Sequence, residues 1–146
     1  MKKKIYILLI ILSVFVITGC NKKVEKPNDK NLLVENKDYF IRGDFNGKYL
    51  DTKKRGYYID TLNEPNAPYF YIICMGEQNT GGYSLEIDKV KRIDDKTEII
   101  VKEIKPKKGD TVTMAFTYPT IIVEFPTSQE NIIIKNTEGE EFTRLN

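Results

Sequence analysis

The chain has 146 residues, with 23 basic and 21 acidic side chains and a formal net charge of +2. It contains no histidine, which excludes Ser–His and Cys–His catalysis and every histidine-ligated metal site. Removal of residues 1–19 as an export signal would leave 127 residues, of which 20 are basic and 21 acidic. That length suits one domain with a modest core, and that balance gives no argument for nucleic-acid binding.

The N-terminus has the pattern of a bacterial export signal. A basic start precedes an almost unbroken apolar run over residues 5–17, which is as long as a signal-peptide core and shorter than the roughly 20 residues that span a bilayer. The sequence Ile17-Thr18-Gly19-Cys20 then resembles the lipobox of bacterial lipoproteins. The resemblance implies cleavage after Gly19 and a diacylglyceryl group, with fatty acids such as palmitate, on Cys20. An uncleaved anchor with a chance cysteine is the alternative.

We therefore expect three regions in the chain. Residues 1–19 are the lipoprotein signal peptide, and residues 20–37 are the lipidated Cys20 with a flexible tether. Between residues 21 and 31 only Val24 is apolar, so this stretch cannot bury itself. Residues 38–146 form a single β-rich domain, which the acyl chains hold at the extracytoplasmic face of a cell membrane in the envelope.

The sequence predicts a mainly β domain, because short apolar and aromatic runs alternate with turn residues. No stretch keeps the 3.6-residue period of an amphipathic helix. Asn46-Gly47 is a hairpin signal. Strands are expected over residues 39–42, 48–51, 57–60, 69–75, 83–88, 97–105, 120–125 and 131–135. Strands of this length and spacing favour a small antiparallel β-sandwich or a partly open barrel.

For two of these segments the sequence also predicts which side chains are buried. Residues 69–75 are continuously apolar and are predicted to form a central, buried strand. Residues 83–88 alternate, with Tyr83, Leu85 and Ile87 facing the core, but Val90 is out of phase with them. A bulge near Lys89 would explain the change of phase.

Two motifs in the second half of the chain resemble a known family. An apolar strand ends at Gly76 and is followed by Thr80-Gly81-Gly82-Tyr83 and an alternating strand. Later, Gly109-Asp110 and Tyr118-Pro119 precede the strand at 120–125. This order of elements, over about residues 69–125, resembles the PrcB C-terminal domain family of bacterial extracytoplasmic proteins, which are often lipoproteins.

The resemblance implies a binding role without catalysis. The family takes its name from a lipoprotein subunit that supports a surface protease complex and is not the peptidase. We therefore expect an accessory module that binds another envelope or secreted protein, a protease subunit among the candidates. No catalytic residue, metal or cofactor is expected apart from the lipid on Cys20, and no nucleic acid is expected as a partner.

Two other functions stay open at this point. Asn79-Thr80-Gly81-Gly82-Tyr83 is similar, with one extra glycine, to the inhibitory loop of chagasin-like cysteine-peptidase inhibitors. Such an inhibitor would insert the loop into the active-site cleft of a peptidase. The third function is an envelope domain that binds a small ligand, which requires a concave apolar pocket.

The candidate partner-binding residues lie in two loops. They are Asn79, Thr80, Gly81, Gly82 and Tyr83 in the first loop, and Tyr118 and Pro119 in the second. Alternate loops of a sandwich gather at one end, so the two loops could form one rim. The structural alternatives are a tight glycine turn in the first loop and an extended X-Pro lead into a strand in the second.

Cys74 lies inside the apolar run at residues 69–75. Since Cys20 is assigned to the lipid, Cys74 has no intramolecular partner and is expected to be a buried, small apolar side chain. A reactive thiol or an intermolecular disulfide is the alternative. The identity of the partner, the oligomeric state and the choice between inner and outer membrane stay open.

Overall fold

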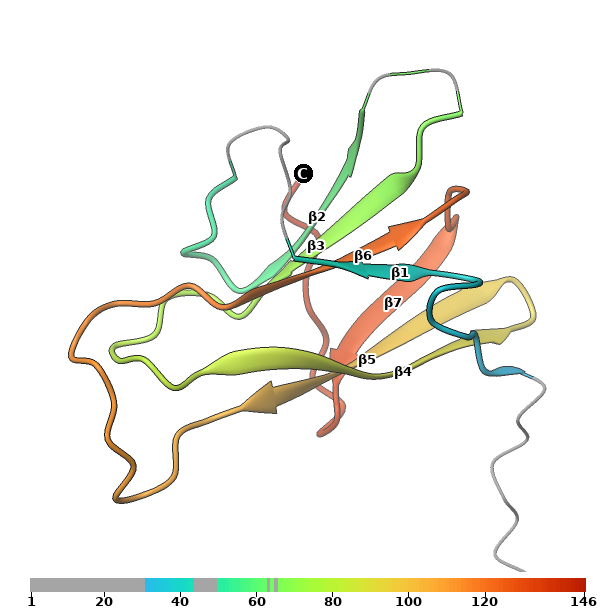
Figure 1. Cartoon of the computed structure of the whole chain (residues 1–146). Coiled ribbons are helices and arrows are strands. Elements are labelled where there is room, and N and C mark those ends of the chain that lie inside the picture. Colours follow the sequence, from blue (N-terminus) through green and yellow to red (C-terminus); the bar gives the residue numbers. More distant parts are fainter. Residues whose placement is uncertain (1–30, 44–49, 63, 65) are drawn as a thin grey trace, which may run out of the picture.

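The computed structural model describes residues 31–43, 50–62, 64 and 66–146 (Figure 1). The predicted signal peptide, Gly19, Cys20 and the Asn46-Gly47 hairpin signal lie outside these residues. In the described part of the chain, no helix is long and apolar enough to cross a membrane. The described residues form seven strands, which are β1 (Phe40–Arg42), β2 (Gly56–Thr61), β3 (Tyr69–Cys74), β4 (Ser84–Ile93), β5 (Lys96–Ile104), β6 (Thr120–Phe125) and β7 (Asn131–Asn136).

The strands form two sheets that face each other, so the mainly β fold class and the sandwich are confirmed (Figure 1). One sheet has the order β1-β6-β3-β2 and the other the order β4-β5-β7, and neither closes into a barrel. The main core lies between them, where Tyr71 and Val123 of the first sheet belong to the same apolar cluster as Val90, Ile99 and Ile134 of the second.

β3 is an internal strand, as its continuous apolar sequence predicts. Because side chains alternate along a strand, Tyr71 and Ile73 belong to the core between the sheets while Phe70, Ile72 and Cys74 belong to a second apolar cluster. That second cluster is packed by the chain's own residues, Leu50 and Leu145 among them. Both faces of β3 are therefore buried, which explains why it has no polar face.

β4 contains the irregularity that the phase change predicts. Its register against β5 shifts between Ile87 and Lys89, which is a β-bulge at Asp88. Leu85 and Val90 are both buried on either side of the shift. Because of this extra residue, Val90 in the second half of β4 faces the core on the same side as Leu85 in the first half.

One strand pair departs from the antiparallel prediction. β7 runs parallel to β5, with Lys96 opposite Asn131 and Val101 opposite Asn136. Parallel neighbours need a crossover connection. Here β6 provides it, since the chain leaves β5, crosses to the other sheet and returns to β7.

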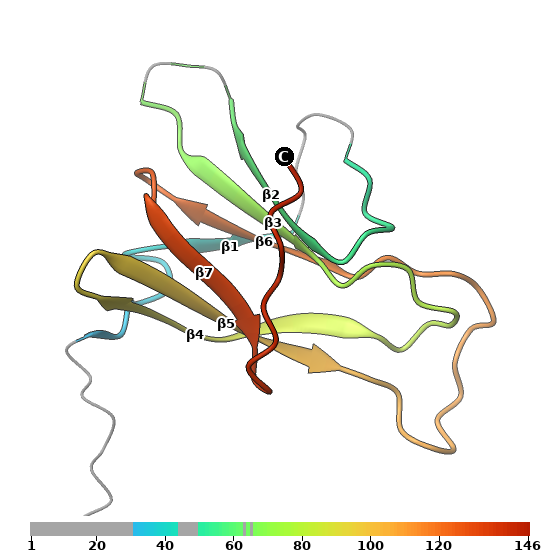
Figure 2. The ribbon, with the colours of Figure 1, turned by 180° about the vertical axis from the view of Figure 1, so that it is seen from behind.

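The C-terminal segment joins the free edges of the two sheets (Figure 2). After the turn that follows β7, the Phe142 amide donates to the Ile134 carbonyl of β7, with an N···O distance of 2.8 Å. Thr143 then accepts from the Tyr57 amide of β2, and Leu145 donates to the Tyr57 carbonyl, both at 2.9 Å. This segment covers parts of two sheet edges that would otherwise expose unpaired backbone groups.

Two local predictions need correction. The expected tether ran to residue 37, but Leu33 donates a backbone hydrogen bond to Val90 of β4 and packs against the core. Leu32 and Leu33 are apolar and half-buried, whereas Val34 is exposed. The strand expected at residues 48–51 is absent from its described part, since Leu50 and Asp51 belong to no strand.

Candidate functional site: the paired loops

Two loops continue the pairing of β3 and β6 beyond the ends of these strands. They comprise residues 75–83, between β3 and β4, and residues 105–119, between β5 and β6, and are called the paired loops here. Gln78 and Thr117 exchange backbone hydrogen bonds with N···O distances of 2.9 and 3.0 Å. Further out, the Gly81 amide donates to the Thr113 carbonyl at 2.9 Å. The pairing makes the two loops one projection, on the left in Figure 1.

Side chains reinforce this pairing. The Thr117 hydroxyl donates to the Thr80 carbonyl at 2.8 Å, and the Tyr118 hydroxyl donates to the Glu77 carboxylate at 3.0 Å. The two sequence-predicted loops therefore form one surface. The position of this surface is a finding, whereas its role in binding stays a prediction.

The two central glycines have structural reasons of their own. Gly82 has a φ of +84°, a conformation that favours glycine. A Cβ on Gly81 would overlap the Thr113 hydroxyl, so glycine permits the close approach of the two loops. Both glycines are therefore required by the local backbone, and this is compatible with a contact role for their neighbours.

The predicted contact residues differ in exposure. Asn79 and Gly82 are exposed, whereas Gly81 is buried under the opposite loop. The remaining predicted residues, Thr80, Tyr83, Tyr118 and Pro119, are half-buried. A partner could thus reach part of each loop without any change of fold.

The most exposed apolar side chains of the surface were missed by the sequence interpretation. Met114 is 87% exposed and Phe116 is 61% exposed, and both lie on the longer loop. The signal that could have found them is the alternation of Val112, Met114 and Phe116 in an otherwise polar or small-residue stretch. Because the loop pairs with its neighbour and not with the core, this alternation leaves Met114 and Phe116 in solvent.

The family comparison covers both loops. A family model described as PrcB C-terminal matches residues 69–126. The match supports the assignment of this segment to the PrcB C-terminal family. The match agrees with the resemblance drawn from residues 69–125, and it begins with β3 and ends just after β6. No curated protein and no solved structure matches the chain at a significant level.

The PrcB C-terminal segment contains four of the seven strands that the described residues form, and the flanking residues complete its sheets. β1 and β2 pair with β6 and β3, and β7 pairs with β5. The flanking strands therefore belong to the same sandwich as the PrcB C-terminal segment.

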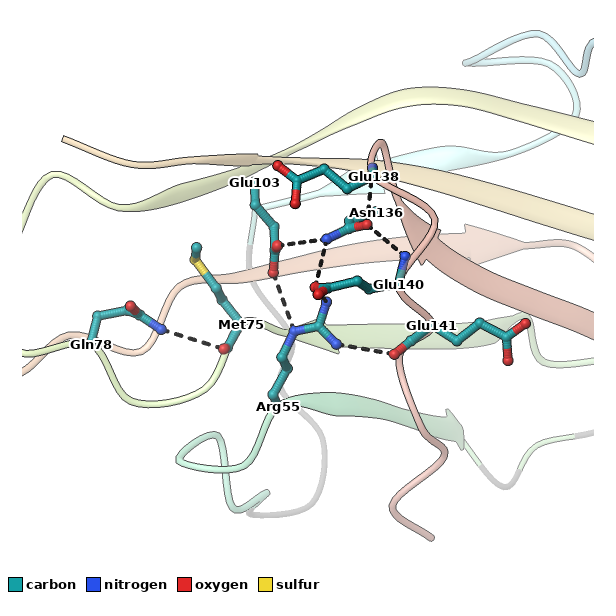
Figure 3. Close-up of polar contacts among 8 residues, drawn as sticks. All are labelled: Arg55, Met75, Gln78, Glu103, Asn136, Glu138, Glu140 and Glu141. Carbon is teal, nitrogen blue, oxygen red and sulfur yellow. Dashed lines mark hydrogen bonds and ion pairs between the residues drawn. The ribbon is translucent and has the colours of Figure 1, made fainter. Parts of the chain in front are cut away.

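Arg55 ties the flanking residues to the PrcB C-terminal segment near the root of the paired loops (Figure 3). Its guanidinium lies 3.3 Å from the Glu103 carboxylate of β5 and 3.7 Å from that of Glu140, and it donates to the Glu141 carbonyl at 3.0 Å. It also lies over the Phe142 ring, 3.9 Å from the centroid. One side chain thus connects the start of β2, the end of β5 and the C-terminal segment.

Asn136 organises the acidic side of this cluster (Figure 3). Its amide nitrogen donates to Glu103 at 3.0 Å and to Glu140 at 3.1 Å. Its amide oxygen accepts from the Glu138 and Glu140 backbone amides at 3.0 and 2.8 Å. Asn136 is buried, and both of its side-chain polar atoms form hydrogen bonds. We therefore interpret the cluster as a structural one, which stabilises the fold near the base of the paired loops.

Cys74 is fully buried, and its burial raises the pKa of the thiol. This environment agrees with the interpretation of Cys74 as a small apolar side chain. Among the described residues, no group of three or more cysteine or acidic side chains is placed to hold a metal ion.

Proposed function

We propose that this chain is a lipid-anchored, extracytoplasmic protein-binding module that supports a surface protease complex. The observation that carries the proposal is the projection formed by the paired loops within a PrcB C-terminal segment. The module acts by binding, and we assign it no catalytic step of its own.

The chemistry of the paired loops favours a protein partner. Met114 and Phe116 are large, exposed apolar side chains on a loop whose backbone is already ordered by its neighbour. Apolar anchors of this kind dominate many protein interfaces, and prior ordering reduces the entropy lost on binding. Lys105, Lys107 and Lys108 lie in the same loop and would supply a polar, basic rim.

The proposed anchor gives the module its location. A diacylglyceryl group and a further acyl chain on Cys20 would hold the domain at the membrane, where two chains anchor stably and one does not. Confinement to this layer raises the effective concentration of the module for other surface proteins. Incorporation of labelled palmitate, abolished by Cys20→Ser, is the expected result for the lipoprotein assignment.

The binding surface can be tested by crosslinking in cells. A photoreactive phenylalanine analogue at Phe116 should capture a defined partner, which mass spectrometry then identifies. The double variant Met114→Ser/Phe116→Ser should lose co-purification of that partner, while its thermal unfolding should match that of the parent. Val34→Ser is the matched control, because Val34 is 54% exposed and lies outside the paired loops.

The outcomes separate the candidate functions. Capture of a protease subunit, whose abundance or activity falls when this chain is deleted, supports the proposal. A captured peptidase that the chain inhibits would instead indicate the inhibitor function. Equal partner recovery with the double variant and with Val34→Ser would contradict the paired loops as the contact surface.

A further inference from the structure

A concave surface lies at the end of the sandwich opposite the paired loops. It is a cavity of about 380 Å³ between the start of β3 in one sheet and the start of β7 in the other. The paired loops, in contrast, extend from the end of β3 and the beginning of β6. A ligand in this cavity would therefore not compete with a partner on the paired loops.

Arg144 lines this cavity without a charged partner. Its side chain makes no ion pair or hydrogen bond with any residue that the structure describes, whereas Arg42 and Arg55 both contact glutamates. The backbone at Arg144 is held by a bridge to Tyr57 of β2, so the position of the residue is defined. An exposed arginine at the mouth of a cavity is thus available to a ligand.

Three tyrosines line the same cavity, Tyr57, Tyr69 and Tyr71. Tyr71 already exchanges hydrogen bonds with the backbone of Gln129, at 3.1 and 3.4 Å. Tyr57 is buried as a residue, but its hydroxyl makes no hydrogen bond with a described residue and is not among the buried polar atoms that lack a partner, so it is open to the cavity. Burial raises the pKa of Tyr57, the positive charge of Arg144 opposes that rise, and the negative charge of Glu141 adds to it.

From this juxtaposition we infer that the cavity binds a small ligand with a carboxylate group. The Arg144 guanidinium would pair with the carboxylate, since planar fork-to-fork pairing is the geometry that arginine favours. The free hydroxyl of Tyr57 would donate to the same group. Tyr69 and the aliphatic side chains of Ile59 and Ile132 would pack against the apolar part of the ligand.

One residue of the cavity opposes an anion. Glu130 lines it and is exposed, and no ion pair with a described residue neutralises its carboxylate. Its negative charge should weaken the binding of a carboxylate. The inference therefore predicts opposite effects for neutralising Glu130 and for neutralising Arg144.

The test uses the detergent-solubilised full chain with benzoate as the probe and benzamide as its uncharged match. Ligand-observed NMR titrations should give at least about tenfold tighter binding of benzoate, as expected for a charge-assisted hydrogen bond. Arg144→Gln should reduce the ratio of benzoate affinity to benzamide affinity to near one. Tyr57→Phe should weaken the binding of benzoate, although the aromatic ring of residue 57 is retained. Glu130→Gln should tighten benzoate binding.

Lys107→Gln is the control, because it removes the same charge from the opposite end of the molecule. Each variant is first checked for an unchanged melting temperature, and Tyr57→Phe provides a second route if Arg144→Gln perturbs the C-terminal segment. Equal binding of benzoate and benzamide, no benzoate binding, or equal effects of Arg144→Gln and Lys107→Gln would overturn the inference. Capture of a protein through Phe116 should not change in the variants of Arg144, Tyr57 and Glu130.

Discussion

Gln78 and Thr117 form a two-way backbone bridge outside both sheets, at N···O distances of 2.9 and 3.0 Å. They are the point at which two connections, far apart in the sequence, become a single surface. The bridge continues the antiparallel register of β3 and β6, in which Cys74 lies opposite Thr120. The surface that we propose for partner binding is therefore an extension of the central strand pair.

The close approach of the loops at Gly81 should be sensitive to one methyl group. Gly81→Ala would place a Cβ against the Thr113 hydroxyl and disturb the hydrogen bond from Gly81 to the Thr113 carbonyl. We expect faster hydrogen exchange of the residue 81 amide and a loss of about 1 kcal/mol in unfolding free energy, the usual net value of one hydrogen bond. Adding Thr113→Ala should restore slow exchange, and no rescue by it would contradict the steric explanation.

The Arg55 cluster should contribute more to stability than an exposed ion pair does. Arg55→Gln removes contacts to Glu103 and Glu140 and the packing on Phe142. We expect urea denaturation to show a loss of about 2 kcal/mol, in the range for hydrogen bonds to charged groups.

Lys54→Gln is the matched control for this prediction. It removes the same charge one residue earlier, from an exposed pair with Asp51 at 3.8 Å. Exposed pairs contribute at most about 1 kcal/mol, so this variant should remain close to the parent. Equal losses in the two variants would show that the cluster adds nothing beyond surface charge.

Cys74 should be unreactive in the folded protein. It is fully buried, and burial raises the pKa of its thiol, so both access and the thiolate fraction are low. In a Cys20→Ser variant, a thiol reagent such as Ellman's should react with Cys74 in urea and not in buffer. Rapid reaction of the folded protein would instead support the reactive-thiol alternative.

Glu98 should make the protein sensitive to acid. It lies between Lys91 and Lys135 at 3.0 and 3.4 Å, and hydrogen bonding and charge from Lys91 are the main causes that lower its pKa. A lowered pKa in the folded state means that this stability is present above the ordinary glutamate pKa and is lost as the pH falls through the folded-state value. Unfolding free energy measured against pH should therefore fall less steeply on acidification in Glu98→Gln than in the parent.

Glu86→Gln is the control for the acid response. Glu86 pairs with Lys102 at 3.7 Å and its side chain is 59% exposed, so water already screens the pair. Its stability curve should have the same slope as that of the parent. If the unfolding free energy of Glu98→Gln falls with decreasing pH as steeply as that of the parent, other carboxylates cause the acid response.

The positions of most strands follow from local sequence. The apolar run of β3 and the alternation of β4 are local patterns, and the change of phase after Asp88 was sufficient to place the bulge. The prediction of a strand near Leu50 was wrong, because the apolar content of a few residues does not specify a partner strand. The N-terminal lipobox is also a local pattern, and it stays a prediction.

The sequence by itself determined the β class, the strands at residues 69–74 and 120–125, and the motif order that the PrcB C-terminal family shares. Only the tertiary structure decided that β7 runs parallel to β5, that the two loops pair, and that Arg144 lies beside Tyr57. The physical reason is the range of the interactions. Side-chain periodicity acts over neighbouring residues, whereas strand pairing and the closing of a cavity depend on contacts between distant segments, which a local pattern does not encode.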